Sequence, residues 1–180
     1  MDAYFTINGR INQETVRSWM QTINSVILDK SPSCLYFLIS SPGGFVNDAK
    51  AFFNFLRALP IKKVMHNMGN IESIGNIVFV AGDERYATPA AHFLLHGLSW
   101  NFVAGASVTH AQIQEINSVL HQGEEDIAQI LASRTKLTKE EIFVLYERGE
   151  SKGLVYAIEK GLISEIRAAH IPSGAFHLVL

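Results

Sequence analysis

The chain has 180 residues, of which 48% are hydrophobic and 18% are charged, and its formal net charge is −2. This length supplies one hydrophobic core and is too short for two ordinary domains, so we expect a single domain over residues 1–180. Because no long run of one charge sign occurs, neither a nucleic acid nor an anionic membrane surface is a predicted partner.

The sequence also lacks the features of an exported protein. Its one cysteine, Cys34, lies in an apolar run, which excludes a disulfide framework and predicts a small buried side chain. The segment Met1–Phe5 has no basic region followed by an apolar one, and no apolar stretch is long enough to span a bilayer. We therefore expect no signal peptide, no membrane span and a cytoplasmic protein.

Strand-like and helix-like segments alternate along the chain, which is the pattern of an α/β fold. The apolar tail is expected to add a strand or to pack on the sheet. Turns are predicted at 8–9 and 69–70. Strands are predicted at 4–7, 34–39, 63–68, 84–87 and 92–95, and helices at 12–28, 46–59, 73–81, 138–148 and 152–160, where Thr138–Glu141 forms a capping box and Gly149 a C-terminal cap.

Residues 105–135 show helical periodicity over an unusual length. One helix of this length would extend for about 45 Å, which is longer than a domain of this size is wide. Two interpretations are open at this point: two helices broken near Gly123, or one projecting helix that packs on another subunit.

Two loops that follow predicted strands have the residue types of an acyl-transfer site. Ser73 lies between a strand and an apolar helix, where unpaired N–H groups and the helix dipole favour a developing negative charge. The pair Gly43-Gly44 exposes main-chain N–H groups that can bind an oxyanion. The simpler alternatives are that Ser73 is a helix N-cap and that the glycines form a plain turn.

A serine nucleophile needs a base, and His96 is the best placed of the seven histidines. It ends the predicted strand 92–95, at the sheet edge where the serine loop is expected. No histidine pair has metalloprotease spacing, and no phosphate-binding glycine loop is present. We therefore predict no metal and no cofactor in this chain.

The order of these motifs resembles the proteolytic subunit of the Clp protease over roughly residues 4–166. The matching features are Ser-Pro-Gly-Gly, then Gly-x-x-x-Ser-x-Gly, a strand ending in His96, and the closing Glu159–Ile163. The resemblance implies an α/β fold built as a spiral of repeated ββα units, shared with crotonases. The head would comprise about 1–104 and 137–180, and a handle helix about 105–136.

The resemblance also implies roles for individual residues. Ser73 matches the nucleophile and His96 the general base, while Gly44 and Ile74 match the two oxyanion N–H donors. The segment 97–105 resembles a strand that pairs with the substrate main chain and with an opposite ring. The implied function is a serine endopeptidase that cleaves peptides or unfolded proteins inside a homo-oligomer of stacked seven-membered rings. Any use of ATP would belong to a partner AAA+ unfoldase.

The sequence departs from the family at the third triad member. The family's aspartate, twelve residues before the glycine of the closing motif, falls on Gly149. Three interpretations are open: Glu150 or Glu147 reaches His96, the site works as a dyad, or the chain is an impaired subunit of a mixed ring. Glu72, beside the nucleophile, is a further carboxylate near the predicted site. A crotonase-type acyl-CoA hydratase or isomerase is the alternative enzyme class.

Overall fold

The computed structural model of the protein covers residues 1–180 and places every strand in one mixed sheet. The strands are β1 (Asp2–Asn8), β2 (Cys34–Ser41), β3 (Lys62–Glu72), β4 (Glu84–Ala87), β5 (His92–Leu94), β6 (Ser151–Lys152), β7 (Glu165–Ile166) and β8 (Phe176–Val179). Their order is β6-β5-β3-β2-β1-β8, with β4 paired to β3 and β7 beside this path. Only β5 and β6 pair antiparallel. This confirms the α/β fold class.

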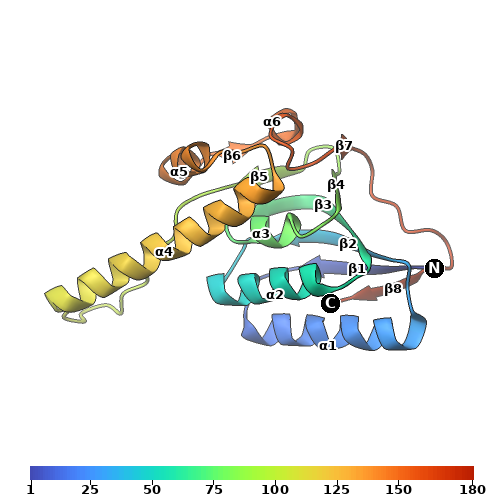
Figure 1. The fold of residues 1–180 in the computed structure, drawn as a ribbon, viewed down its shortest axis with the longest axis horizontal. Coiled ribbons are helices and arrows are strands. Elements are labelled where there is room, and N and C mark those ends of the chain that lie inside the picture. The colour runs from blue at the N-terminus through green and yellow to red at the C-terminus, as the bar shows by residue number, and fades with distance from the viewer.

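Six helices connect and cover the strands. They are α1 (Gln13–Lys30), α2 (Val46–Ala58), α3 (Gly75–Phe79), α4 (His110–Arg134), α5 (Lys139–Arg148) and α6 (Leu154–Glu159). Helices α1 and α2 lie side by side against the sheet, as Figure 1 shows, and the Trp19 and Phe52 rings pack between them with centroids 5.2 Å apart. Cys34 is buried, as predicted.

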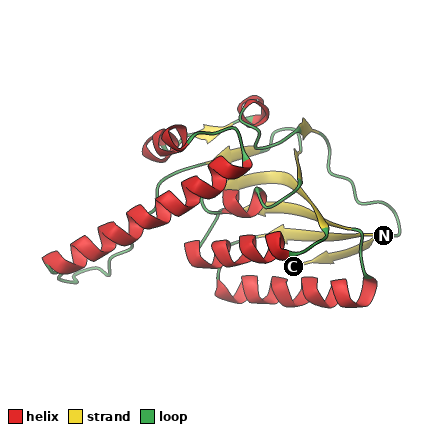
Figure 2. Ribbon diagram, in the orientation of Figure 1, coloured by secondary structure: helices red, strands yellow, loops and turns green.

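Helix α4 projects from the rest of the molecule (Figures 1 and 2). It is one continuous helix of 25 residues that runs through Gly123, so the two-helix interpretation is wrong. It begins at His110 rather than near residue 105, because Thr109 caps it in a capping box with Gln112. Only its C-terminal part is buried in the core, through Ile127, Ala128 and Leu131.

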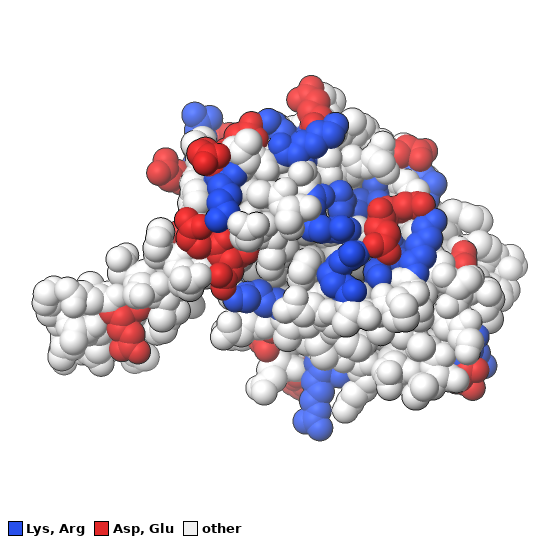
Figure 3. All heavy atoms as spheres, viewed as in Figure 1, with Lys and Arg blue, Asp and Glu red and all other residues white.

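The projecting part of the chain is almost uncharged. Between residues 97 and 123 the only Asp, Glu, Lys or Arg is Glu115, and Figure 3 shows this region as a nearly white extension. Several large apolar side chains on it are about half exposed or more, among them Trp100, Phe102, Val103, Ile113 and Val119. Exposed apolar surface of this extent is typical of a contact with another protein subunit.

Strand β3 differs from its prediction. The turn expected at Gly69-Asn70 is absent, and the strand continues to Glu72. Residues 64–67 pair with β4, whereas residues 70–72 pair with β5. On the other side of β3, where it pairs with β2, the register between these two strands shifts between Ile39 and Ser41. A glycine at this point therefore marks a bend within a strand and not its end.

The C-terminal third follows its prediction with two changes. The Thr138–Glu141 capping box is present and Gly149 ends α5 with φ +59, both as predicted. The helix predicted over 152–160 is shorter, because Ser151 and Lys152 pair with β5. The tail forms β8 beside β1, in parallel.

The segment 97–109, which precedes α4, contains no strand. The resemblance implied a strand in this segment that pairs outside its own chain. Inside this chain no neighbouring strand is available to it, so its main chain is irregular.

Candidate active site

Ser73 lies in a sharp turn between β3 and α3. Its φ is +54, a left-handed value that costs a residue with a side chain about 1–2 kcal/mol. The Ser73 N–H donates to the Leu94 carbonyl at 2.8 Å, and the Ser73 carbonyl accepts from the backbone and side-chain amides of Asn76. The helix was predicted to begin at Ser73, but α3 begins at Gly75 with Ile74 as its N-cap. Ser73 therefore lies before the helix and does not cap it.

His96 lies two residues beyond the end of β5. This strand is paired with the last residues of β3, which brings His96 to the same sheet edge as Ser73. The Nδ1 atom of His96 is 2.7 Å from the Gly97 carbonyl oxygen. Since a carbonyl only accepts, Nδ1 carries the proton and donates it, and the other ring nitrogen, Nε2, keeps its lone pair. This is the tautomer that a general base needs.

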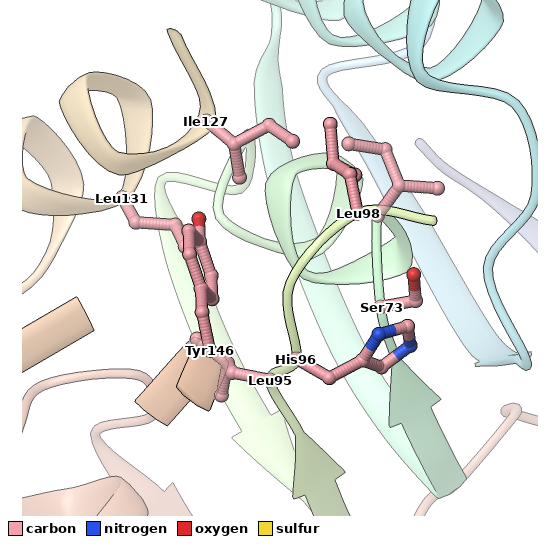
Figure 4. Close-up of a pocket in the computed structure, with 8 residues that line it drawn as sticks. Ser73, Leu95, His96, Leu98, Ile127, Leu131 and Tyr146 are labelled. Carbon is pink, nitrogen blue, oxygen red and sulfur yellow. The ribbon is translucent and has the colours of Figure 1, made fainter. Parts of the chain in front are cut away.

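Ser73 and His96 line the same small, mostly apolar pocket (Figure 4). They lie side by side on one wall, and Leu131 and Tyr146 form the wall across from them. The two polar side chains make no direct hydrogen bond. Both side chains are partly exposed, so a substrate can reach them from outside.

The loop after β2 packs directly against the serine turn. A Cβ atom on Gly43 would lie 2.7 Å from the Ser73 Cβ atom and 3.3 Å from the Ile74 nitrogen, so only glycine fits there. The Gly43 N–H is taken by the Ser41 hydroxyl, at 3.1 Å. In contrast, the N–H groups of Gly44 and Ile74 have no hydrogen-bond partner within the chain. These two free donors are the ones predicted for the oxyanion.

No carboxylate contacts His96. A Cβ atom on Gly149 would lie 4.0 Å from the His96 Cβ atom, so position 149 is adjacent to the histidine but has no side chain. Glu150 is exposed and its carboxylate binds Lys152 at 2.5 Å, an ion pair that lowers the pKa of Glu150. Glu147 is exposed, and Glu72 accepts a hydrogen bond from Asn70. The predicted contact of Glu150 with His96 is therefore not formed.

Three residues of the site gave no signal in the sequence. Asn76 ties the Ser73 carbonyl to the Leu94 carbonyl through its amide, which donates to both. Glu124, on α4, accepts the Leu98 N–H at 2.9 Å. Tyr146 forms a wall of the pocket with a buried hydroxyl that has no hydrogen-bond partner, and burial raises its pKa, helped by the charge of Glu124. Each of the three has at least one neighbour at the site that is distant in the sequence.

Two further properties of the chain concern metal ions and membranes. No group of three or more His, Cys, Asp or Glu side chains is arranged to hold a metal ion. None of the helices has both the length and the apolar character that crossing a bilayer requires.

Comparison with known proteins decides the family. Residues 2–170 match the Clp protease family. The chain belongs to the Clp protease family. Similar proteins include the ATP-dependent Clp protease proteolytic subunit 2 of Pseudomonas aeruginosa, 26% identical over 89% of this chain and 78% of that protein. The proteolytic subunit 1 of Leifsonia xyli subsp. xyli is 25% identical over 92% of this chain and 83% of its own length.

Membership of the Clp protease family confirms the resemblance seen in the sequence. It also selects the serine-peptidase interpretation over the crotonase-type hydratase or isomerase, because the match extends over nearly the whole chain. The enzyme class of this Clp protease family member is that of a serine-type peptidase.

Proposed function

We propose that this chain hydrolyses peptide bonds with Ser73 as the nucleophile and His96 as the general base. The observation that carries this assignment is the left-handed turn at Ser73, which presents the serine beside His96 in one pocket. Strained backbone conformations persist only where the surrounding structure maintains them, and they cluster at active sites. The family membership supports the reaction class, and this geometry supports the choice of residues.

The chemistry follows from the protonation state of His96. With Nδ1–H donated to the Gly97 carbonyl, Nε2 is free to take the proton of the Ser73 hydroxyl as its oxygen attacks the substrate carbonyl. His96 then gives this proton to the leaving amine, which completes the acyl-enzyme. Water, deprotonated by the same nitrogen, releases the acid product and regenerates Ser73.

The Gly44 and Ile74 N–H groups are the proposed oxyanion donors. Both are unpaired in the free protein, and they come from the two loops that meet at Gly43 and Ser73. Donors that are already free of other partners can bind the negative charge that develops on the substrate oxygen. The loss of one such donor costs on the order of 10²- to 10³-fold in kcat.

We further propose that the chain assembles into rings through α4 and the segment before it. The support is the length of α4 beyond the core and the near absence of charge between residues 97 and 123. The resemblance implies stacked seven-membered rings. A separate AAA+ unfoldase would use ATP to deliver substrate chains to these rings. Peptides and unfolded proteins are the proposed substrates. The cytoplasm is the proposed location, in keeping with the unpaired, buried Cys34.

One specific observation favours a second candidate function. Gly149 places no acid beside His96, and a triad without its acid can lose about 10⁴-fold in rate. The chain would then act as a structural subunit in a ring with a complete homologue. This alternative predicts co-purification with that homologue and no hydrolysis by this chain alone.

The test is labelling of the assembled protein with a fluorophosphonate probe, followed by hydrolysis of fluorogenic peptides. We expect labelling of wild type and none of Ser73→Ala, with Ser18→Ala, an exposed serine on α1 outside the pocket, as the matched control that keeps the label. Absence of label on folded, assembled wild type would refute Ser73 as a nucleophile.

A further inference from the structure

The hydrogen bonds around His96 continue beyond the Gly97 carbonyl. That carbonyl and the Leu98 N–H belong to the same peptide group. On one side the group accepts from His96 Nδ1 at 2.7 Å, and on the other it donates to Glu124 Oε1 at 2.9 Å. One planar amide therefore connects the imidazole to a carboxylate.

From this connection we propose that Glu124 is a positioning residue for His96 that acts through the Gly97–Leu98 peptide group. In this way Glu124 takes over part of the role of the acid that is absent at Gly149. This inference rests on the proposed function of Ser73 and His96. A carboxylate that accepts the amide N–H polarises the amide and makes its carbonyl a stronger acceptor, because hydrogen bonds in a chain reinforce one another. The stronger acceptor fixes the His96 ring and stabilises the imidazolium that forms during the reaction.

The charge of Glu124 is available for this role. Of three consecutive acids on α4, Glu125 pairs with Lys139 and Asp126 pairs with Lys50. Glu124 has no Lys, Arg or His partner, and its only hydrogen bond is the one from Leu98 N–H. A partly buried carboxylate without a counter-ion is costly unless something else compensates its charge. The polarised peptide, and the imidazolium behind it, provide that compensation.

The packing around the peptide group fixes its orientation. A Cβ atom on Gly97 would lie 2.9 Å from Glu124 Oε1, so a larger residue at this position would displace the carboxylate from its present place. The Gly97 N–H donates to the Tyr146 carbonyl at 3.3 Å, which ties the loop to α5. Glu124 itself comes from the part of α4 that precedes the buried residues Ile127 and Leu131. The handle helix thus holds the loop that orients the base.

The experiment measures kcat and KM for a fluorogenic peptide, and the rate of Ser73 labelling, in the assembled full chain. Glu124→Gln retains an acceptor for Leu98 N–H but removes the charge, and Glu125→Gln is the matched control one residue away. We expect Glu124→Gln to lower kcat on the order of 10- to 100-fold with little change in KM, because hydrogen bonds to charged groups are about twice as strong as neutral ones. Glu125→Gln should stay within about twofold of wild type.

A second background separates positioning from a merely structural role. Gly149→Asp supplies a direct carboxylate to His96, so the Glu124→Gln loss should shrink to about threefold or less in the double variant. Equal losses in both backgrounds would mean that Glu124 only supports the fold. Wild-type kinetics in Glu124→Gln, or activity that appears only with Gly149→Asp, would also overturn the inference. If no variant shows Ser73-dependent labelling or hydrolysis, the proposed function itself fails, and the inference fails with it.

Discussion

The vacant position beside His96 makes Gly149→Asp the most informative single substitution. A Cβ atom at residue 149 meets nothing closer than the His96 Cβ atom, at 4.0 Å, so there is room for a side chain beside the histidine, and we expect the carboxylate of an aspartate to reach the imidazole. The backbone there has φ +59, which aspartate tolerates better than most residues do. The substitution should cost about 1 kcal/mol of stability.

The gain in rate can be worked from the change of acceptor. At present His96 Nδ1 donates to a neutral carbonyl, a bond with a net worth of about 1 kcal/mol, whereas a charged acceptor is worth about 1.5–3 kcal/mol. The difference of roughly 0.5–2 kcal/mol corresponds to an increase of about 2- to 30-fold in kcat. The full effect of a triad acid, about 10⁴-fold, is the upper limit.

The assay is hydrolysis of a fluorogenic peptide by the assembled protein, together with the second-order rate of Ser73 labelling. Gly149→Asn is the matched control, because asparagine has the same shape and also tolerates this backbone conformation but has no charge. We expect the Asp variant to exceed both wild type and the Asn variant in both rates. Equal rates for the Asp and Asn variants would refute the reasoning that the missing charge at residue 149 limits His96.

Three further substitutions test other features of the fold. Ser73→Gly should be more stable than Ser73→Ala by about 1 kcal/mol in urea unfolding, because glycine adopts φ +54 without strain, and equal midpoints would contradict this. Burial lowers the pKa of His66 below its usual 6.5, so the unfolded chain binds a proton that the folded one does not. The free energy of unfolding should therefore fall as the pH drops below about 6.5, and it should fall less steeply in His66→Gln. The exposed control His121→Gln should keep the wild-type slope. If His66→Gln also keeps the wild-type slope, His66 is not the group responsible. Arg85 donates to five carbonyl groups, which a lysine cannot span. Arg85→Lys should therefore lower the free energy of unfolding by about 2–3 kcal/mol. A loss no larger than that of the exposed control Arg17→Lys would show that these hydrogen bonds do not stabilise the fold.

Local sequence patterns determined much of this protein. The apolar run that begins at Cys34 predicted a buried strand, and the capping box at Thr138 with the glycine at 149 fixed both ends of α5. The length of the helical periodicity over 105–135 indicated either one projecting helix or two broken helices, and the structure shows one. Features of this kind depend on residues that are close together in the chain, where hydrogen bonding and side-chain spacing are set by neighbours.

The sequence also predicted which residues approach one another at the site, through the order of its motifs. Ser73, His96 and Ile74 line one pocket, and the N–H groups of Ile74 and Gly44 have no hydrogen-bond partner within the chain. Their roles stay predictions until the labelling experiment is done. The absence of an acid at Gly149 followed from the resemblance to the Clp protease family, whose aspartate falls on this position.

Only the tertiary structure decided the rest, because each of these features depends on a contact between distant segments. The glycine at 69 lies within a strand, since β3 bends where it changes its neighbour from β4 to β5. Ser73 leaves the predicted helix because the Leu94 carbonyl, from a different strand, binds its N–H. The bond from Leu98 N–H to Glu124 joins residues 26 positions apart, and no local period marks either of them. That bond, and the peptide group it polarises, appear only when the handle helix is packed against the loop after β5.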